Sequence, residues 1–123
     1  MAKIEKFEDL EIWRLAREIC QKIEFLIQNT NLKTNYSLKD QIDRSSGSIM
    51  DNIAEGFERN GNREFIQFLS IAKGSAGEVK SQSYRAFDKK LITEDQHFKL
   101  NEIVELEKNK IGAMMNYLNN CEI

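Results

Sequence analysis

The groups in this sequence that could do chemistry are one histidine, two cysteines and several pairs of nearby acids. Glu94 and His97 form an E-x-x-H, which is the ligand spacing of di-iron four-helix bundles. Such a site takes this motif from two helices together with further glutamates, whereas this chain has a single histidine. We therefore interpret the pair as an acid at a helix start beside a surface histidine, and we predict neither a metal site nor a cofactor.

The other reactive groups do not predict catalysis. A histidine base would have to be His97, and no glycine-rich phosphate loop or nucleophile elbow precedes a helix. Acid pairs such as Glu105 and Glu107 are typical of solvated helix faces. Cys20 falls in an apolar helical pattern and Cys121 lies near the end of the chain, so neither belongs to a CxxC pair. We predict no catalytic residues and expect that the protein is not an enzyme.

The charge distribution indicates a binding surface instead. The whole chain carries a net charge of −2, whereas residues 59–90 carry seven basic and three acidic side chains. On a helical wheel, four basic residues of this segment lie away from the large apolar side chains: Arg63, Lys73, Lys80 and Arg85. They form either an ordinary solvated helix face or, repeated around an oligomer, a contact surface for a polyanion. Structured RNA is the expected ligand. The sequence places no surface aromatic cluster beside these residues, so we do not expect a sequence-specific reader of single strands.

The same segment holds a stripe of small residues on its non-apolar side, made of Ser70, Gly74, Gly77 and Ser81. A glycine inside a helix costs about 1 kcal/mol relative to alanine, so repeated glycines call for an explanation. Either small side chains are tolerated on an exposed face, or a helix of a second subunit packs closely against them. We predict the second arrangement, in which the protein self-associates through this stripe.

Four amphipathic segments must position these residues. Apolar side chains recur at three-and-four spacing, no segment alternates as a strand does, and short polar breaks between long helices favour antiparallel neighbours. The sequence therefore predicts a single domain over residues 1–123, an all-α, antiparallel up-down-up-down four-helix bundle. Its helices are expected near residues 8–28, 37–59, 62–89 and 94–119.

Local signals mark some of the helix ends. Ser37 is the expected N-cap of the second helix, and Asn60 or Gly61 is the expected left-handed residue that ends it. Thr93 and Gln96 form a capping box at the start of the fourth helix. These signals divide the chain at the same places as the apolar periodicity.

The composition is that of a globular protein, with 41% hydrophobic and 31% charged residues. No apolar run approaches the length of a membrane span, and no signal-peptide pattern opens the chain. Two cysteines are too few for a disulfide framework. We expect a cytoplasmic protein without a membrane partner.

Three stretches of the sequence resemble one bacterial family: "FEDLEIWRLA", "QIDRSSGSIMDNIAEGFERN" and "REFIQFLSIAKGSAGEVKSQ". They are similar to the 23S rRNA intervening-sequence proteins, which are small four-helix bundles encoded in insertions within ribosomal RNA genes or elsewhere in bacterial genomes. The most specific part runs from Asn52 to Glu78. Relatives of that family include the accessory variability determinant of diversity-generating retroelements, a pentameric barrel that binds nucleic acid and a reverse transcriptase. The resemblance therefore implies a homopentamer.

Two functions stay open from the sequence. The first is a non-enzymatic homo-oligomer that binds RNA or DNA through the basic face of the third helix. The second is a protein-interaction scaffold or accessory subunit, for example for a reverse transcriptase, without direct contact to nucleic acid. Salt-dependent binding to an oligonucleotide would favour the first, because binding to phosphates releases counterions.

Overall fold

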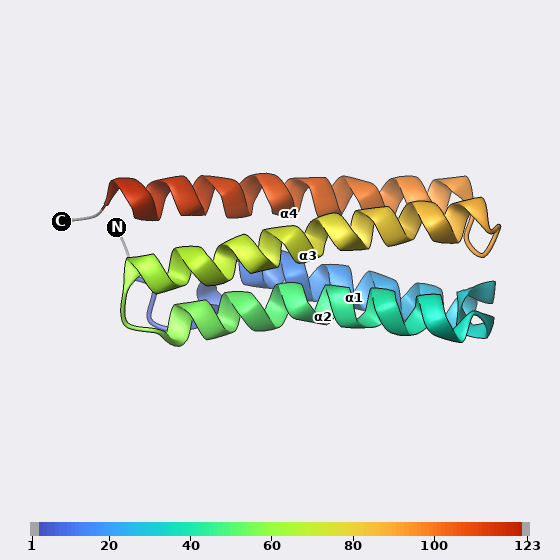
Figure 1. The fold of residues 1–123 in the computed structure, drawn as a ribbon, viewed down its shortest axis with the longest axis horizontal. Helices are drawn as coiled ribbons and strands as arrows, with labels where there is room; N and C mark the ends of the chain where they lie inside the picture. Colours follow the sequence, from blue (N-terminus) through green and yellow to red (C-terminus); the bar gives the residue numbers. More distant parts are fainter. Residues whose placement is uncertain (1–2, 122–123) are drawn as a thin grey trace.

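The computed structural model describes residues 3–121, and these form four long helices packed side by side (Figure 1). Successive helices run in opposite directions, and no strand occurs within residues 3–121. The predicted all-α, up-down-up-down four-helix bundle is thus confirmed. In chain order, the elements are the short 3-10 turn η1 (Phe7–Asp9), α1 (Glu11–Asn29), the 3-10 turn η2 (Asn31–Thr34), α2 (Tyr36–Glu58), α3 (Asn62–Asp88) and α4 (Glu94–Asn120).

Each helix buries one apolar face in a shared core. Helix α3 packs between α2 and α4, and α1 closes the bundle against the same two helices (Figure 1). Fully burying an aliphatic side chain contributes about 1.5–3 kcal/mol, so these faces are the main source of stability. The largest fully buried apolar side chains are Ile19, Ile23, Leu32, Leu38, Ile42, Ile49, Ile53, Leu69, Val79, Leu100 and Ile111.

Two predicted helix starts are wrong in detail. Helix α1 begins at Glu11 rather than at residue 8, because η1 occupies residues 7–9 and the Leu10 amide donates to the Phe7 carbonyl at 2.9 Å. Helix α2 begins one residue before the predicted start, at Tyr36, and its N-cap is not Ser37. The Asn35 side chain accepts a hydrogen bond from the Leu38 amide at 3.1 Å. Asparagine is among the strongest N-cap residues, and it reaches the free amides of the first turn.

Of the two turns that flank α3, the sequence predicts the one after the helix correctly and the one before it wrongly. The capping box of Thr93 and Gln96 is confirmed, with hydrogen bonds of 3.1 and 2.9 Å between side chains and backbone. The prediction of a left-handed residue at position 60 or 61 is wrong. Gly61 is extended (φ −177°) and precedes α3, whereas the described residue with a positive φ is Lys90 at 61°.

One glycine is required by the packing of α2 on α3. A Cβ atom on Gly56 would lie 2.7 Å from the Phe68 Cβ and 2.9 Å from the Phe65 Cδ1. Real Cβ atoms do not come this close to other atoms, so position 56 lets the two helices approach at their common end. Gly56 thus has a reason inside the subunit.

Candidate nucleic-acid interface

The four basic residues predicted on α3 do not form a single stripe. Arg63 is exposed in the first turn of α3, and Arg85 leans toward α2, where its Nη1 donates to the Gln41 Oε1 at 2.8 Å. Lys73 and Lys80 lean the other way, toward α4. The structure therefore places Lys73 and Lys80 on the side of α3 that faces α4, two helical turns apart, and separates them from Arg85.

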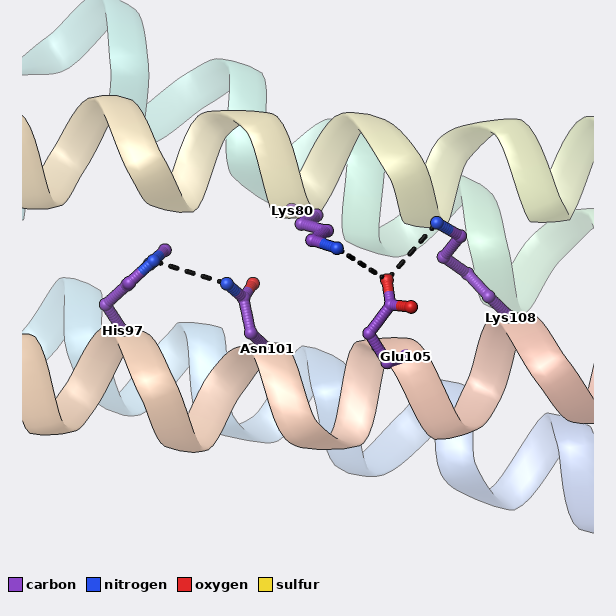
Figure 2. A network of polar contacts seen from close by, with 5 residues as sticks. All are labelled: Lys80, His97, Asn101, Glu105 and Lys108. Carbon is purple, nitrogen blue, oxygen red and sulfur yellow. Dashed lines mark hydrogen bonds and ion pairs between the residues drawn. The ribbon is translucent and has the colours of Figure 1, made fainter.

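A third lysine joins this pair from α4. Figure 2 shows Lys80 and Lys108 reaching the same carboxylate oxygen, the Glu105 Oε2, from two different helices. The two nitrogen–oxygen distances are 3.0 and 3.2 Å. The hydrogen bonds from Lys80 and then Lys108 hold the pKa of Glu105 below its ordinary value. The side chains remain partly open to solvent, with 34% of Lys80, 28% of Lys108 and 43% of Glu105 exposed.

Lys73 lies farther along the same side of α3. Its Nζ would be 3.6 Å from a Cβ atom on Gly112, which is an ordinary contact distance, so the end of the Lys73 side chain lies over α4 at this glycine. Lys73 and Lys108 both line a hollow of about 430 Å³ between the helices, together with Asn109, Gly112 and Asn116. We call this surface the α3–α4 groove and define it by Lys73, Lys80, Lys108, Glu105 and Gly112.

His97 lies beyond one end of the groove and is not the surface residue that the sequence predicts. It is 7% exposed, its Nδ1 lies 2.7 Å from the Ser83 Oγ, and its Nε2 lies 3.2 Å from the Asn101 Nδ2 (Figure 2). A serine hydroxyl bonded to an imidazole is also the geometry of an activated nucleophile. Because Ser83 is fully buried, at 0% exposed, a substrate cannot reach its hydroxyl in this structure. The pair therefore links α3 to α4 inside the bundle.

An exposed aromatic ring, which was not predicted from the sequence, stands beside the groove. Tyr84 follows Lys80 by one turn of α3 and is 49% exposed. Its ring centroid lies 4.3 Å from that of His97, and the two planes meet at 62°. His97 itself stacks on Phe87 with centroids 5.3 Å apart. One side of the tyrosine ring is thus supported by a buried network.

The small stripe of α3 lies on the outside of the subunit, as the wheel predicts. Ser70, Gly74 and Ser81 are exposed, and Gly77 is half-buried. Apart from the neighbouring backbone of α3 itself, no atom of residues 3–121 lies within 4 Å of a Cβ added at Gly74 or Gly77. No contact within this part of the chain therefore requires glycine at these two positions, in contrast to Gly56.

Glu107 is an acid that the sequence places on the surface and the structure places in the interior. It is 0% exposed, and neither carboxylate oxygen has a hydrogen-bond partner among the described residues. Burial, and then the negative charge of Glu11, raise the pKa of Glu107 from its ordinary value of 4.5 to about 8. Lys110, the nearby cation of α4, pairs with Glu11 at 3.4 Å instead.

Residues 3–121 contain no cluster of three or more histidine, cysteine, aspartate and glutamate side chains arranged to hold a metal ion. None of the helices in this part of the chain combines the length and the apolar character that a membrane span requires.

Sequence reasoning missed two residues of this surface, Lys108 and Tyr84. The spacing of Glu105 and Lys108 already predicts an ion pair on one helix face, at i and i+3. Lys80 reaches the same carboxylate because of the way α3 and α4 align along their axes. No local sequence pattern predicts that alignment. Tyr84 was not predicted because it directly follows the buried Ser83, so a helical wheel places it next to the apolar face.

Comparison with known proteins agrees with this fold. Residues 8–116 match the family model of the 23S rRNA-intervening sequence protein. The fold is similar to the crystal structure of a protein of unknown function from the S23 ribosomal protein family of Bacteroides thetaiotaomicron, with a TM-score of 0.76. That protein is 22% identical, and the alignment covers 85% of this chain and 97% of the other. No curated protein matches the sequence significantly. The chain belongs to the 23S rRNA-intervening sequence protein family.

Proposed function

We propose that this protein binds nucleic acid without catalysing a reaction, using the lysines of the α3–α4 groove as contacts to phosphates. The observation that carries the proposal is the placement of three lysines between two helices of an otherwise acidic chain. Lys80 and Lys108 meet at Glu105, and Lys73 and Lys108 line one hollow. Lysine ammonium groups bind phosphate oxygens as point charges, and such contacts give affinity without sequence selectivity. Arg63 and Arg85 lie on the same helix outside the groove, and they extend the basic surface beyond it.

Assembly would multiply this surface. We propose a homo-oligomer, most simply the pentamer that the family resemblance implies, with the small stripe of α3 at the contact between subunits. The open space around Gly74 and Gly77 supports this arrangement, because it admits the backbone of a neighbouring helix. Repeating the groove around a ring would concentrate positive potential that one subunit alone provides weakly.

Charge reversal tests the binding function. The variant carrying Lys73→Glu and Lys80→Glu is expected to lose binding to a labelled RNA, measured by fluorescence anisotropy at several salt concentrations, while light scattering reports an unchanged oligomer. Wild-type affinity should fall steeply with salt because counterions are released. The matched control is Lys22→Glu with Lys33→Glu, which changes the net charge equally at two exposed positions of the α1–η2 region. If the groove variant instead dissociates, and the milder glutamine variants do so too, the lysines hold subunits together and the binding proposal is wrong.

The assembly proposal is tested at Gly77. Gly77→Leu is expected to weaken or abolish the oligomer, because the leucine would occupy the space that a neighbouring backbone needs. Gln21→Leu places the same side chain on an exposed position of α1 and should leave the assembly mass unchanged. Light scattering at micromolar concentration measures both. A Gly77→Leu protein that keeps its mass and melts at a higher temperature would show that this face meets solvent, since leucine favours the helix.

A protein-interaction scaffold is the second candidate function. Exposed aromatic side chains on α1 and α4 favour it, namely Phe25 at 58% and Phe98 at 60% exposed. Phe25 lines a hollow of about 330 Å³ between these helices, next to Lys22, Asp95 and Lys99. A scaffold should co-purify with a polypeptide and keep it after nuclease treatment, whereas the proposed nucleic-acid binder should lose its ligand.

A further inference from the structure

We infer that the α3–α4 groove receives an unpaired segment of nucleic acid, whose phosphate replaces Glu105 between Lys80 and Lys108 and one of whose bases stacks on Tyr84. The inference rests on the proposed nucleic-acid binding and adds the form of the ligand. It differs from the expectation drawn from the sequence, which was structured RNA.

The first step is the geometry around Glu105. A single carboxylate oxygen lies within hydrogen-bond distance of two ammonium groups from different helices (Figure 2). A non-bridging phosphate oxygen carries a similar charge and accepts the same hydrogen bonds. All three side chains are partly exposed, so water and a ligand can reach the cluster. Glu105 therefore occupies the position of the anion and competes with it.

The second step is the direction of the groove. Along α3, Lys73, Lys80 and Tyr84 follow one another over eleven residues, which at 1.5 Å per residue is roughly 16 Å. At the Lys73 end, the groove continues into the hollow lined by Lys73, Lys108 and Gly112. A strand lying along it would meet two cationic positions and then an aromatic ring. This length accommodates only a short segment of a few nucleotides.

The third step concerns Tyr84. Its ring is held on one side by the edge contact with His97, and His97 is fixed by Ser83 and Phe87, so the orientation of the tyrosine is set before a ligand binds. The ring is still 49% exposed. Bases in a duplex are stacked on one another and unavailable, whereas an unpaired base can stack on an exposed aromatic ring. Tyr84 beside Lys80 thus favours a single strand over a duplex.

The test compares a labelled ten-nucleotide oligo(U), the matching oligo(dT) and a duplex of the same length, by anisotropy at low salt. Glu105→Gln is expected to raise affinity for the single strands up to about tenfold, because it frees two ammonium groups for phosphate. Glu102→Gln, which removes an exposed acid from the same helix, is the matched control and should raise affinity less. Lys108→Gln should lower affinity and reduce the salt slope by about 0.7.

Tyr84→Leu should weaken binding of both single strands several-fold and leave duplex binding unchanged, whereas Tyr36→Leu, at a tyrosine 72% exposed outside the groove, should change neither. Circular dichroism melts establish that each variant is folded. Equal effects on oligo(U) and oligo(dT) would mean that the 2′-hydroxyl is not read; a preference for oligo(U) would mean that it is. Both results support an unpaired ligand.

Two outcomes are distinguishable as failures. If the wild-type protein binds none of the three probes, the proposed function itself is wrong. If it binds and the Lys73→Glu, Lys80→Glu variant abolishes binding, but Glu105→Gln and Tyr84→Leu change nothing, the proposed function stands. The placement of a phosphate at Glu105 and of an unpaired base on Tyr84 is then wrong. Tighter binding of the duplex than of the single strands would likewise overturn the inference.

Discussion

Replacing Glu107 with glutamine is expected to stabilise the fold, by an amount that grows as the pH rises from about 5 to about 9. The Glu107 side chain is fully buried, and its carboxylate oxygens have no hydrogen-bond partner within residues 3–121. Its pKa is about 8 in the folded protein, because burial and the charge of Glu11 disfavour the ionised form. At neutral pH the folded protein therefore holds a proton that the unfolded chain has released.

The sign follows from that proton. The pKa of Glu107 is raised on folding, from 4.5 to about 8, so its contribution to stability is fully present below pH 4.5. It is lost as the pH rises through this window, by up to roughly 5 kcal/mol, which is a large share of the 5–15 kcal/mol typical of a domain. Glutamine resembles the protonated acid in shape and does not ionise. The variant should match the wild type at low pH and exceed it at high pH.

Urea unfolding at about pH 5 and about pH 9 measures this difference, at one fixed protein concentration because assembly also contributes to stability. Glu102→Gln on the same helix is the control for the loss of one acidic charge at the surface. Parallel pH dependences of the Glu107→Gln and wild-type stabilities would contradict the prediction. That result would mean that the Glu107 carboxylate finds a partner or water in solution.

The four helices could be predicted because their apolar positions repeat at helical spacing over many turns. Ile42, Ile49 and Ile53 of α2 are all fully buried, as their spacing requires. The capping box at Thr93 was readable because both of its residues lie within four positions of each other. The residue at which a helix starts is harder to predict, because neighbouring residues can compete to be the N-cap. Asn35 and Ser37 are both good caps, and only the path of the chain from η2 selects the first.

The buried polar residues could not be predicted, because periodicity treats every charged residue as exposed. Glu105 and Glu107 are two residues apart, or about 200° around the helix, so they cannot lie on one face. The structure buries Glu107 and leaves Glu105 43% exposed, and the spacing alone does not say which of the two lies inside. His97 was misread in the same way, although it is buried and bonded to Ser83. Its partner lies fourteen residues earlier, on another helix.

The α3–α4 groove was only half visible in the sequence. A helical wheel places Lys73 and Lys80 on one side of α3, but it contains no information on which neighbouring helix covers that side. Lys108 was not predicted as part of a basic surface, because it lies in a segment whose net charge is negative. The groove depends on the alignment of α3 and α4, and that alignment is set by core packing along both helices.

The glycines of α2 also differ in whether they lie against a neighbouring helix, and this difference predicts opposite effects on stability. Gly56→Ala is expected to destabilise the bundle, whereas Gly47→Ala on the same helix is expected to stabilise it. A methyl group at position 56 would lie 2.7 Å from the Phe68 Cβ, which is fixed to the backbone of α3 and cannot rotate away. At position 47, no atom of residues 3–121 outside the neighbouring backbone of α2 lies within 4 Å of the added carbon.

Both changes improve helix propensity, by at most about 1 kcal/mol, and less at position 56 because α2 ends at Glu58. Overpacking at Gly56 costs about 1–3 kcal/mol, since α2 and α3 must move apart or the Phe65 ring must leave its rotamer. The two single substitutions should thus shift the free energy of unfolding in opposite directions, measured by urea denaturation. A stabilised Gly56→Ala protein would show that α2 and α3 are less closely packed at this end, and that Gly56, like Gly74 and Gly77, has no partner inside the subunit.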